Sequence, residues 1–187
     1  MQKMRLIETS LQLSKGHLSE NGALMVRTGP STGRSTKERF VVRYPETETE
    51  IEWGAINQPM DVEKAETFFT VLQKNIESQQ NFSMKGYVGC FDVKVTSLSP
   101  WHIAFAENMF RETYIQTLKQ QVPDDVSIEI WHAPECTMSE LGIEHDFEKA
   151  IVLDPKNLRV GIVGTAYAGE IKKSAFTLCN FLLPKYD

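Results

Sequence analysis

The stretch TGPSTGRSTKERF, residues 28–40, combines glycines, hydroxyls and a guanidinium in the manner of a phosphate-binding loop. A P-loop has the pattern GxxxxGK followed by Ser or Thr, and it lies between a strand and a helix. Here only three residues separate Gly29 from Gly33, and Arg34 stands where the lysine would be. A β-rich run begins at Phe40, where a helix would be needed. The sequence therefore does not predict a nucleotide loop in this stretch.

Arg34 can still be considered as an anion-binding residue. A guanidinium beside a glycine at a tight turn can present its planar fork freely, and that fork matches carboxylate and phosphate groups in a bidentate way. The alternative is that Gly29 and Gly33 supply unusual backbone angles while Arg34 faces water. Short strings of Gly, Ser, Thr and Arg are common, so this segment alone slightly favours the turn.

A second stretch, VGTAYAGEIKKSAF at residues 163–176, predicts a strand that passes through small residues around Tyr167 into a helix. Such a junction aims free N–H groups and the positive end of the helix dipole outward. Lys172 and Lys173 lie in the first turn, where two adjacent ammonium groups are disfavoured; a neutral amine could bind a metal or accept a hydrogen bond. A solvated lysine pair beside Glu170 explains the same pattern equally well.

Other candidates are interpreted as structural. The run from His132 to Cys136 matches no zinc spacing, and Glu144-His145-Asp146 is predicted to be a polar loop. His102 follows Trp101 on an expected helix and is predicted to be a partly buried helix residue rather than a base. Neither a GxSxG nor an HExxH motif is present.

Composition limits the class of protein. The 187 residues are 41% hydrophobic and 24% charged, which is typical of one soluble globular domain or a large piece of one. A net charge of −5 argues against nucleic acid or anionic lipid as the main partner. No apolar run approaches the ~20 residues of a membrane span, and we expect no signal peptide. Three dispersed cysteines (Cys90, Cys136, Cys179) indicate reduced thiols and a cytoplasmic protein.

Hydrophobic periodicity predicts strands alternating with helices. Asp61 is expected to cap one helix, and Ser99-Pro100 to begin another. The core face of the first is predicted to hold Val62, Ala65, Phe69, Leu72 and Ile76, and that of the second Trp101, Phe105, Met109 and Tyr114. Strands are expected at 23–26, from 40, and at 86–95, 127–131, 150–153 and 158–163, with a last helix from about Ile171. The predicted fold is α/β, a mixed β-sheet flanked by helices.

Four stretches, taken in order, carry a family resemblance. GALMVRTGPSTGRSTKERFVV and GTAYAGEIKKSAFTLCNFLLP resemble two signature stretches of the N-terminal domain of ATP-dependent phosphoenolpyruvate carboxykinase. WGAINQPM and WHIAFAENMF are similar to further pieces of that domain, in the same order. The resemblance covers nearly the whole chain, from about Asn21 onward. It implies that residues 1–187 form one such N-terminal domain, without the family's C-terminal P-loop kinase domain.

The resemblance also implies chemistry. Family enzymes are decarboxylating lyases of gluconeogenesis that interconvert oxaloacetate and phosphoenolpyruvate, using ATP and divalent manganese or magnesium. By resemblance, Arg34 holds the substrate's carboxylate and phosphate, and Tyr167 lines the phosphoenolpyruvate and CO2 pocket. Lys173 ligates the metal through its amine, and Lys172 is its basic, substrate-binding neighbour. Arg34, Tyr167 and Lys173 would thus be catalytic, with metal and arginine stabilising the enolate as CO2 leaves.

The chain also departs from the family pattern. Ser35-Thr36 replaces the usual Ser-Pro, and Lys37-Glu38-Arg39 replaces Lys-Asp-Lys while keeping the charges. After LLPKYD the family continues into a metal-binding histidine, a true P-loop, a metal-binding aspartate and a further substrate arginine. We therefore expect no nucleotide site and no demonstrable cofactor in this chain alone, and a single protein ligand for the metal.

Three hypotheses follow. The first is the N-terminal substrate-binding part of a carboxykinase, inactive alone, and either cut from the full enzyme or encoded apart from a separate C-terminal kinase domain. The second is a stand-alone, non-catalytic relative that binds a small dicarboxylate, a phosphorylated acid or a protein partner. The third, an unrelated structural protein, requires the signature residues to be coincidental and is the least favoured.

Overall fold

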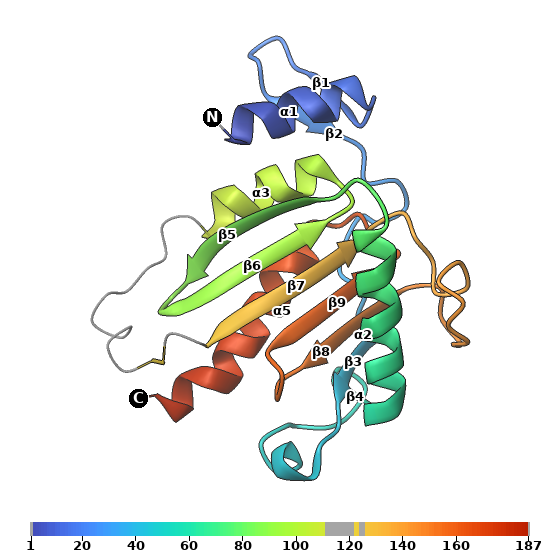
Figure 1. Ribbon diagram of the computed structural model, residues 1–187, viewed down its shortest axis with the longest axis vertical. Coiled ribbons are helices and arrows are strands. Elements are labelled where there is room, and N and C mark those ends of the chain that lie inside the picture. Colours follow the sequence, from blue (N-terminus) through green and yellow to red (C-terminus); the bar gives the residue numbers. More distant parts are fainter. Residues whose placement is uncertain (1, 111–121, 124–125, 187) are drawn as a thin grey trace.

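A seven-stranded sheet forms the centre of the computed structural model, which describes residues 2–110, 122–123 and 126–186. Its order is β4-β3-β8-β9-β7-β6-β5 (Figure 1). The strands are β3 (Arg39–Val42), β4 (Gln58–Met60), β5 (Phe82–Val88), β6 (Phe91–Ser97), β7 (Ser127–Ala133), β8 (Ala150–Asp154) and β9 (Arg159–Val163). The β5–β6 and β8–β9 pairs are antiparallel and the other four are parallel. The predicted α/β class with a mixed sheet is confirmed.

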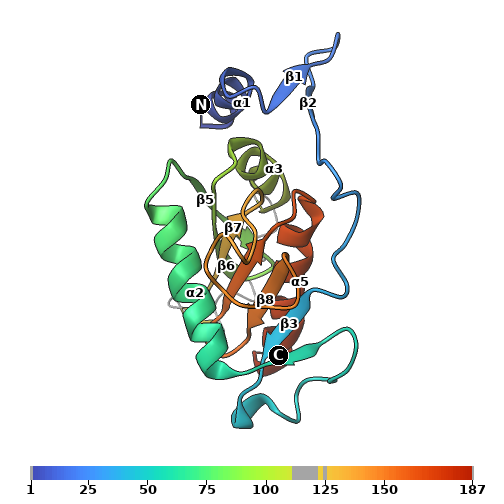
Figure 2. The ribbon, with the colours of Figure 1, turned by 90° about the vertical axis from the view of Figure 1, so that its right-hand side faces the viewer.

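Helices cover both faces of this sheet. α2 (Val62–Glu77) lies on one face, and α3 (Pro100–Phe110) and α5 (Gly169–Leu182) lie on the other (Figure 2). α1 (Gln2–Gln12) packs against α3. Short 3-10 turns, η1 (Pro45–Thr47) and η2 (Leu183–Lys185), complete the described helices. None of the helices in the described part of the chain has the length and apolar character needed to cross a bilayer.

The burial of each strand depends on its position in the sheet. β8, in the interior of the sheet, is buried along its whole length, whereas β5 at the edge alternates buried and exposed residues. The side chain of Asp61 caps α2, as predicted, by accepting hydrogen bonds from the N–H groups of Glu63 (2.8 Å) and Lys64 (3.4 Å). α2 then packs so closely on β9 that a methyl group on Gly161 would overlap the ring of Phe68.

Some predicted elements differ from the structure. The single strand expected at 86–95 is wrong, because the chain turns at Gly89 (φ +61°) and forms the β5–β6 hairpin. α5 begins at Gly169, before the expected Ile171. β1 (Gly16–Leu18) and β2 (Leu24–Val26) form a separate hairpin, and neither β4 nor α1 was predicted. Tyr114 lies outside the described residues.

Candidate functional site

The segments singled out by the sequence meet along one edge of the sheet, the edge formed by the ends of the strands and not by an outer strand. β6, β7 and β9 are parallel, so their carboxyl ends emerge together. β8 and β3 run the opposite way and begin at this edge, with Ala150 opposite Val163 and Arg39 opposite Ile151. The segment that leads into β3 and the segment that leaves β9 therefore meet. The carboxyl ends of parallel strands are the usual place for ligand sites in α/β proteins.

A backbone-to-carboxylate hydrogen bond joins the two segments. The N–H of Ser35 donates to Oε1 of Glu170 (2.8 Å), and Glu170 lies in the first turn of α5 with only 3% of its surface exposed. Gly29 supplies a left-handed turn (φ +57°) earlier in the same loop. The structure thus brings the Arg34 loop against the start of the helix that carries Lys172 and Lys173.

Arg34 itself is exposed at the tip of this loop. Within the part of the chain that the structure describes, its guanidinium has no hydrogen bond and no ion pair; its interaction there is repulsion from Arg39. An arginine with unused donors next to a second guanidinium is suited to binding an external anion. Of the two explanations that the sequence left open for Arg34, this arrangement is compatible with the anion-binding one.

Arg39 has a different role because it is buried and engaged. Its Nη2 donates to Oγ1 of Thr177 (3.0 Å), and that hydroxyl donates to the carbonyl of Lys173 (2.9 Å). Burial, followed by the positive charge of Arg34, lowers the pKa of Arg39, while Glu170 acts in the opposite direction. Arg39 therefore fastens α5 to β3 and adds positive charge to the site.

Tyr167 lies just before α5, with its ring folded back over the helix start. A Cβ atom on Gly169 would come within 2.5 Å of Cε1 and 2.9 Å of the hydroxyl oxygen of Tyr167. The backbone N–H of Tyr167 also donates to Oγ1 of Thr165 (3.2 Å). Glycine at 169 is thus what allows the half-buried phenol to rest against the backbone.

The two lysines of α5 are not equivalent. Nζ of Lys172 lies 5.4 Å from the centre of the Phe176 ring, a cation–π contact one helical turn along, and the side chain is half-buried. Lys173 is exposed, and successive helix residues point about 100° apart. The amine of Lys173 is therefore the more accessible one for an added ligand.

Two expectations about ligand binding need qualification. The predicted free N–H groups at the start of α5 are partly used, because those of Glu170 and Ile171 donate to the carbonyls of Tyr167 and Ala168. Anion binding here would rely mainly on side chains. Among the described residues no group of three or more His, Cys, Asp or Glu could hold a metal. Lys173 offers one donor, so in the described part of the chain it would need further ligands to hold a metal.

Sequence reasoning missed two residues at this edge, His102 of α3 and His132 of β7. Both were interpreted as structural, and His102 as only partly buried, yet their side chains are 1% and 0% exposed. Each hydrogen-bonds a backbone carbonyl immediately before Tyr167. Burial lowers the pKa of His132 to about 4; burial, and then the neighbouring His132, lowers the pKa of His102 well below its ordinary value. No local pattern points to them, because their partners are distant in the sequence.

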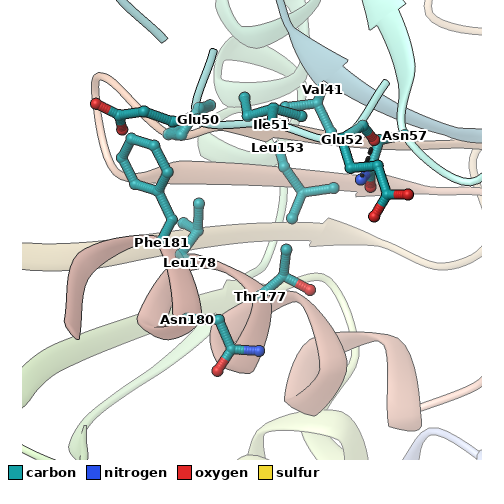
Figure 3. A pocket seen from close by; sticks show the side chains of 11 residues that line it. Val41, Glu50, Ile51, Glu52, Asn57, Leu153, Thr177, Leu178, Asn180 and Phe181 are labelled. Atoms are coloured by element: carbon teal, nitrogen blue, oxygen red, sulfur yellow. Dashed lines mark hydrogen bonds between the residues drawn. The ribbon is translucent and has the colours of Figure 1, made fainter. Parts of the chain in front are cut away.

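A separate hollow of about 190 Å³ lies further along α5, between that helix and residues 50–57 (Figure 3). Its walls are mainly apolar, with Val41, Ile51, Leu153, Leu178 and Phe181 pointing inward. The side chain of Asn57 is turned to the carbonyl of Glu52 (2.9 Å). Arg34, Tyr167 and the two lysines do not line this hollow, so the candidate site is the edge described above.

Comparison with known proteins shows the family of the chain. The family model of phosphoenolpyruvate carboxykinase matches residues 1–187. The chain is similar to the ATP-type phosphoenolpyruvate carboxykinases of Thermus thermophilus (37% identical; 96% of this chain, 35% of the relative) and Bacillus cytotoxicus (35% identical; 98% and 35%). It is also similar to enzyme 2 of this name from Moorella thermoacetica (34% identical; 97% and 35%). The chain spans about a third of the length of these relatives, and it belongs to the phosphoenolpyruvate carboxykinase family.

Proposed function

We propose that this chain is the N-terminal, substrate-binding part of an ATP-dependent phosphoenolpyruvate carboxykinase. The full enzyme would convert oxaloacetate and ATP to phosphoenolpyruvate, ADP and CO2, a decarboxylation used in gluconeogenesis. The observation that carries the proposal is the Ser35–Glu170 hydrogen bond, which joins the Arg34 loop to α5, the helix that carries Lys173 and directly follows Tyr167. Arg34, Arg39 and the two lysines of α5 then supply more positive charge than the one carboxylate, Glu170, which already accepts the N–H of Ser35.

The residues divide the work of binding a dianionic acid. Arg34, which has no hydrogen-bond partner in the part of the chain that the structure describes, would bind a carboxylate or phosphate through its fork, while Arg39 is occupied in holding α5. The ring of Tyr167, resting on Gly169, would form one wall of the pocket and orient the acid. Lys172 adds a cation along the same helix. As negative charge develops on the substrate oxygen, these positive groups would stabilise it.

A divalent metal, manganese or magnesium, would supply Lewis-acid stabilisation of that oxygen when bound. Lys173 is the residue of this chain that would ligate it, and the remaining ligands would come from elsewhere in the assembled enzyme. ATP would likewise bind outside this chain, on a C-terminal kinase domain. For this reason we expect the chain to bind substrate but to show no turnover alone.

The test is a titration of the isolated chain with phosphoenolpyruvate, followed by amide chemical shifts in NMR. Shifts should concentrate at residues 31–37 and 165–173. Arg34→Lys keeps the charge but loses the second hydrogen bond, so the affinity should fall about tenfold. Arg43→Lys is the matched control, because Arg43 is an exposed arginine paired with Glu48. Equal affinities for the wild type and Arg34→Lys, or shifts confined to other regions, would contradict the assignment.

A further inference from the structure

Two buried histidines hydrogen-bond the backbone of the segment between β9 and α5. Nε2 of His132 lies 3.0 Å from the carbonyl oxygen of Thr165, and Nε2 of His102 lies 3.1 Å from that of Ala166. The two rings meet edge to face, with centroids 4.3 Å apart. One ring comes from a strand and the other from a helix, so two separate elements hold two successive carbonyls.

The partners of the rings determine which nitrogen carries the proton. A carbonyl oxygen can only accept, so both Nε2 atoms must be N–H donors. In a neutral imidazole the Nδ1 atoms then accept, His132 from the hydroxyl of Ser97 (2.9 Å) and His102 from that of Ser99 (2.8 Å). Oγ of Ser97 in turn accepts from the N–H of Ser99 (3.1 Å). The result is two parallel serine–histidine–carbonyl relays, each satisfied at every ring nitrogen.

The relay through His102 holds the peptide group that precedes Tyr167, and the relay through His132 holds the peptide group before that one. The carbonyl of Ala166 and the N–H of Tyr167 belong to the same planar unit. His102 holds the oxygen of that unit and Oγ1 of Thr165 holds its N–H (3.2 Å). Because both ends are bonded, the plane cannot rotate, and the direction in which the Tyr167 side chain leaves the backbone is set.

Part of the role of this arrangement is stability, because apolar side chains in place of the two imidazoles would leave the carbonyls of Thr165 and Ala166 without these donors. Trp101 stacks on His102 at 3.4 Å between ring centroids, which fixes the imidazole from a further side. Hydrogen bonds are directional whereas apolar contacts are not, so what the polar groups add is orientation.

We infer that His102 and His132 are positioning residues for substrate binding, acting on Tyr167 through the carbonyls of Ala166 and Thr165. The inference extends the proposed function to the groups that make its binding wall rigid. Neither histidine touches the substrate.

The first test reads the structure directly and does not depend on any ligand. At pH 7, the 15N shifts of both imidazoles should show the neutral form with hydrogen on Nε2. The ring of Tyr167 over Gly169 should produce a large ring-current shift of the Gly169 α-protons. In His102→Leu that shift should be lost, and in His102→Gln, which keeps a donor near the Nε2 position, it should be retained. An Nδ1–H tautomer, or an unchanged shift in His102→Leu, would overturn the inference.

The second test measures phosphoenolpyruvate affinity. His102→Leu should weaken binding about tenfold, the equivalent of one misplaced contact, and His102→Gln should recover most of it. Ile103→Ala, a cavity on the same helix at a fully buried position, is the control for lost stability alone and should leave the affinity unchanged. If Ile103→Ala weakens binding as much as His102→Leu, the histidine's role is only structural.

Two safeguards separate the possible outcomes. If His102→Leu does not fold, Ser99→Ala keeps the ring but removes the hydroxyl that holds Nδ1, and it should reduce the ring-current shift partially. If the wild type binds no phosphoenolpyruvate while the ring-current results are as expected, the proposed function fails and the positioning of Tyr167 stands.

Discussion

Acidification should destabilise this protein through His132 at pH values above those at which its carboxylates become protonated. Burial lowers the pKa of His132 from an ordinary 6.5 to about 4. Between these values the unfolded chain binds a proton that the folded chain does not, so the free energy of unfolding falls as the pH falls. The contribution of His132 is fully present above pH 6.5 and is lost progressively toward pH 4. At about 1.4 kcal/mol per pH unit, this amounts to about 2 kcal/mol at pH 5 and about 3 kcal/mol at pH 4.

The magnitude is large relative to a total stability of about 5–15 kcal/mol. His102 acts in the same direction, because its pKa is also lowered. The pKa values of the carboxylates of Glu46, Glu48 and Glu148 are lowered. Their contributions to stability are therefore lost at more acidic pH, as the pH falls below the ordinary 4.5. A loss of stability between pH 6.5 and 5 is therefore attributable to the histidines.

Urea unfolding followed by circular dichroism at pH 7.5, 6.5, 5.5 and 5 would measure this slope. His132→Gln cannot titrate but keeps an N–H donor. Between pH 7.5 and 5 its free energy of unfolding should therefore fall by about 2 kcal/mol less than that of the wild type. A wild-type free energy of unfolding that is constant from pH 7.5 to 5, or a His132→Gln variant with the wild-type slope, would refute the reasoning.

Three further substitutions test separate contacts. Gly169→Ala places a methyl group within 2.5 Å of the Tyr167 ring, so phosphoenolpyruvate affinity should fall about tenfold in a calorimetric titration; unchanged affinity would mean that the ring position is not needed. Glu170→Ala removes the acceptor of the Ser35 N–H, and hydrogen exchange should show that this amide loses its protection. Gly161→Ala overfills the contact of β9 with α2 and should lower the free energy of unfolding by about 1–3 kcal/mol in urea, whereas a neutral result would mean that α2 can shift.

The local elements could be predicted from the sequence because their signals are local. Asp61 before a stripe of buried residues is sufficient to place the start of α2, and β-branched runs are sufficient for the central strands. The β5–β6 hairpin was missed because its turn, Gly89-Cys90, is embedded in a run with the composition of one continuous strand. A single glycine gives little warning of a reversal when the flanking residues favour strand on both sides.

The site was only partly predictable, for a related reason. Arg34 and Lys173 stand out within their own stretches and take their specific roles from resemblance to a family, and no pattern within either stretch indicates that Ser35 would bond Glu170, a residue 135 positions away. His102 and His132 were dismissed because each was judged by its own neighbours. Their function comes from partners that only the packing of α3 and β7 against the β9–α5 segment brings together.

The two walls of the site are held with unequal strength, and this has a consequence for binding. Tyr167 follows a peptide group bonded at both ends, with two imidazole relays behind it. The Arg34 loop is joined to α5 by the Ser35–Glu170 bond, and the guanidinium of Arg34 has no hydrogen-bond partner among the described residues. A rigid wall lowers the entropic cost of orienting a ligand, while a loosely held arginine can close on it after it arrives. Substitutions on the Tyr167 side should therefore change the position of the bound acid. Substitutions in the Arg34 loop should change the rate at which the acid dissociates.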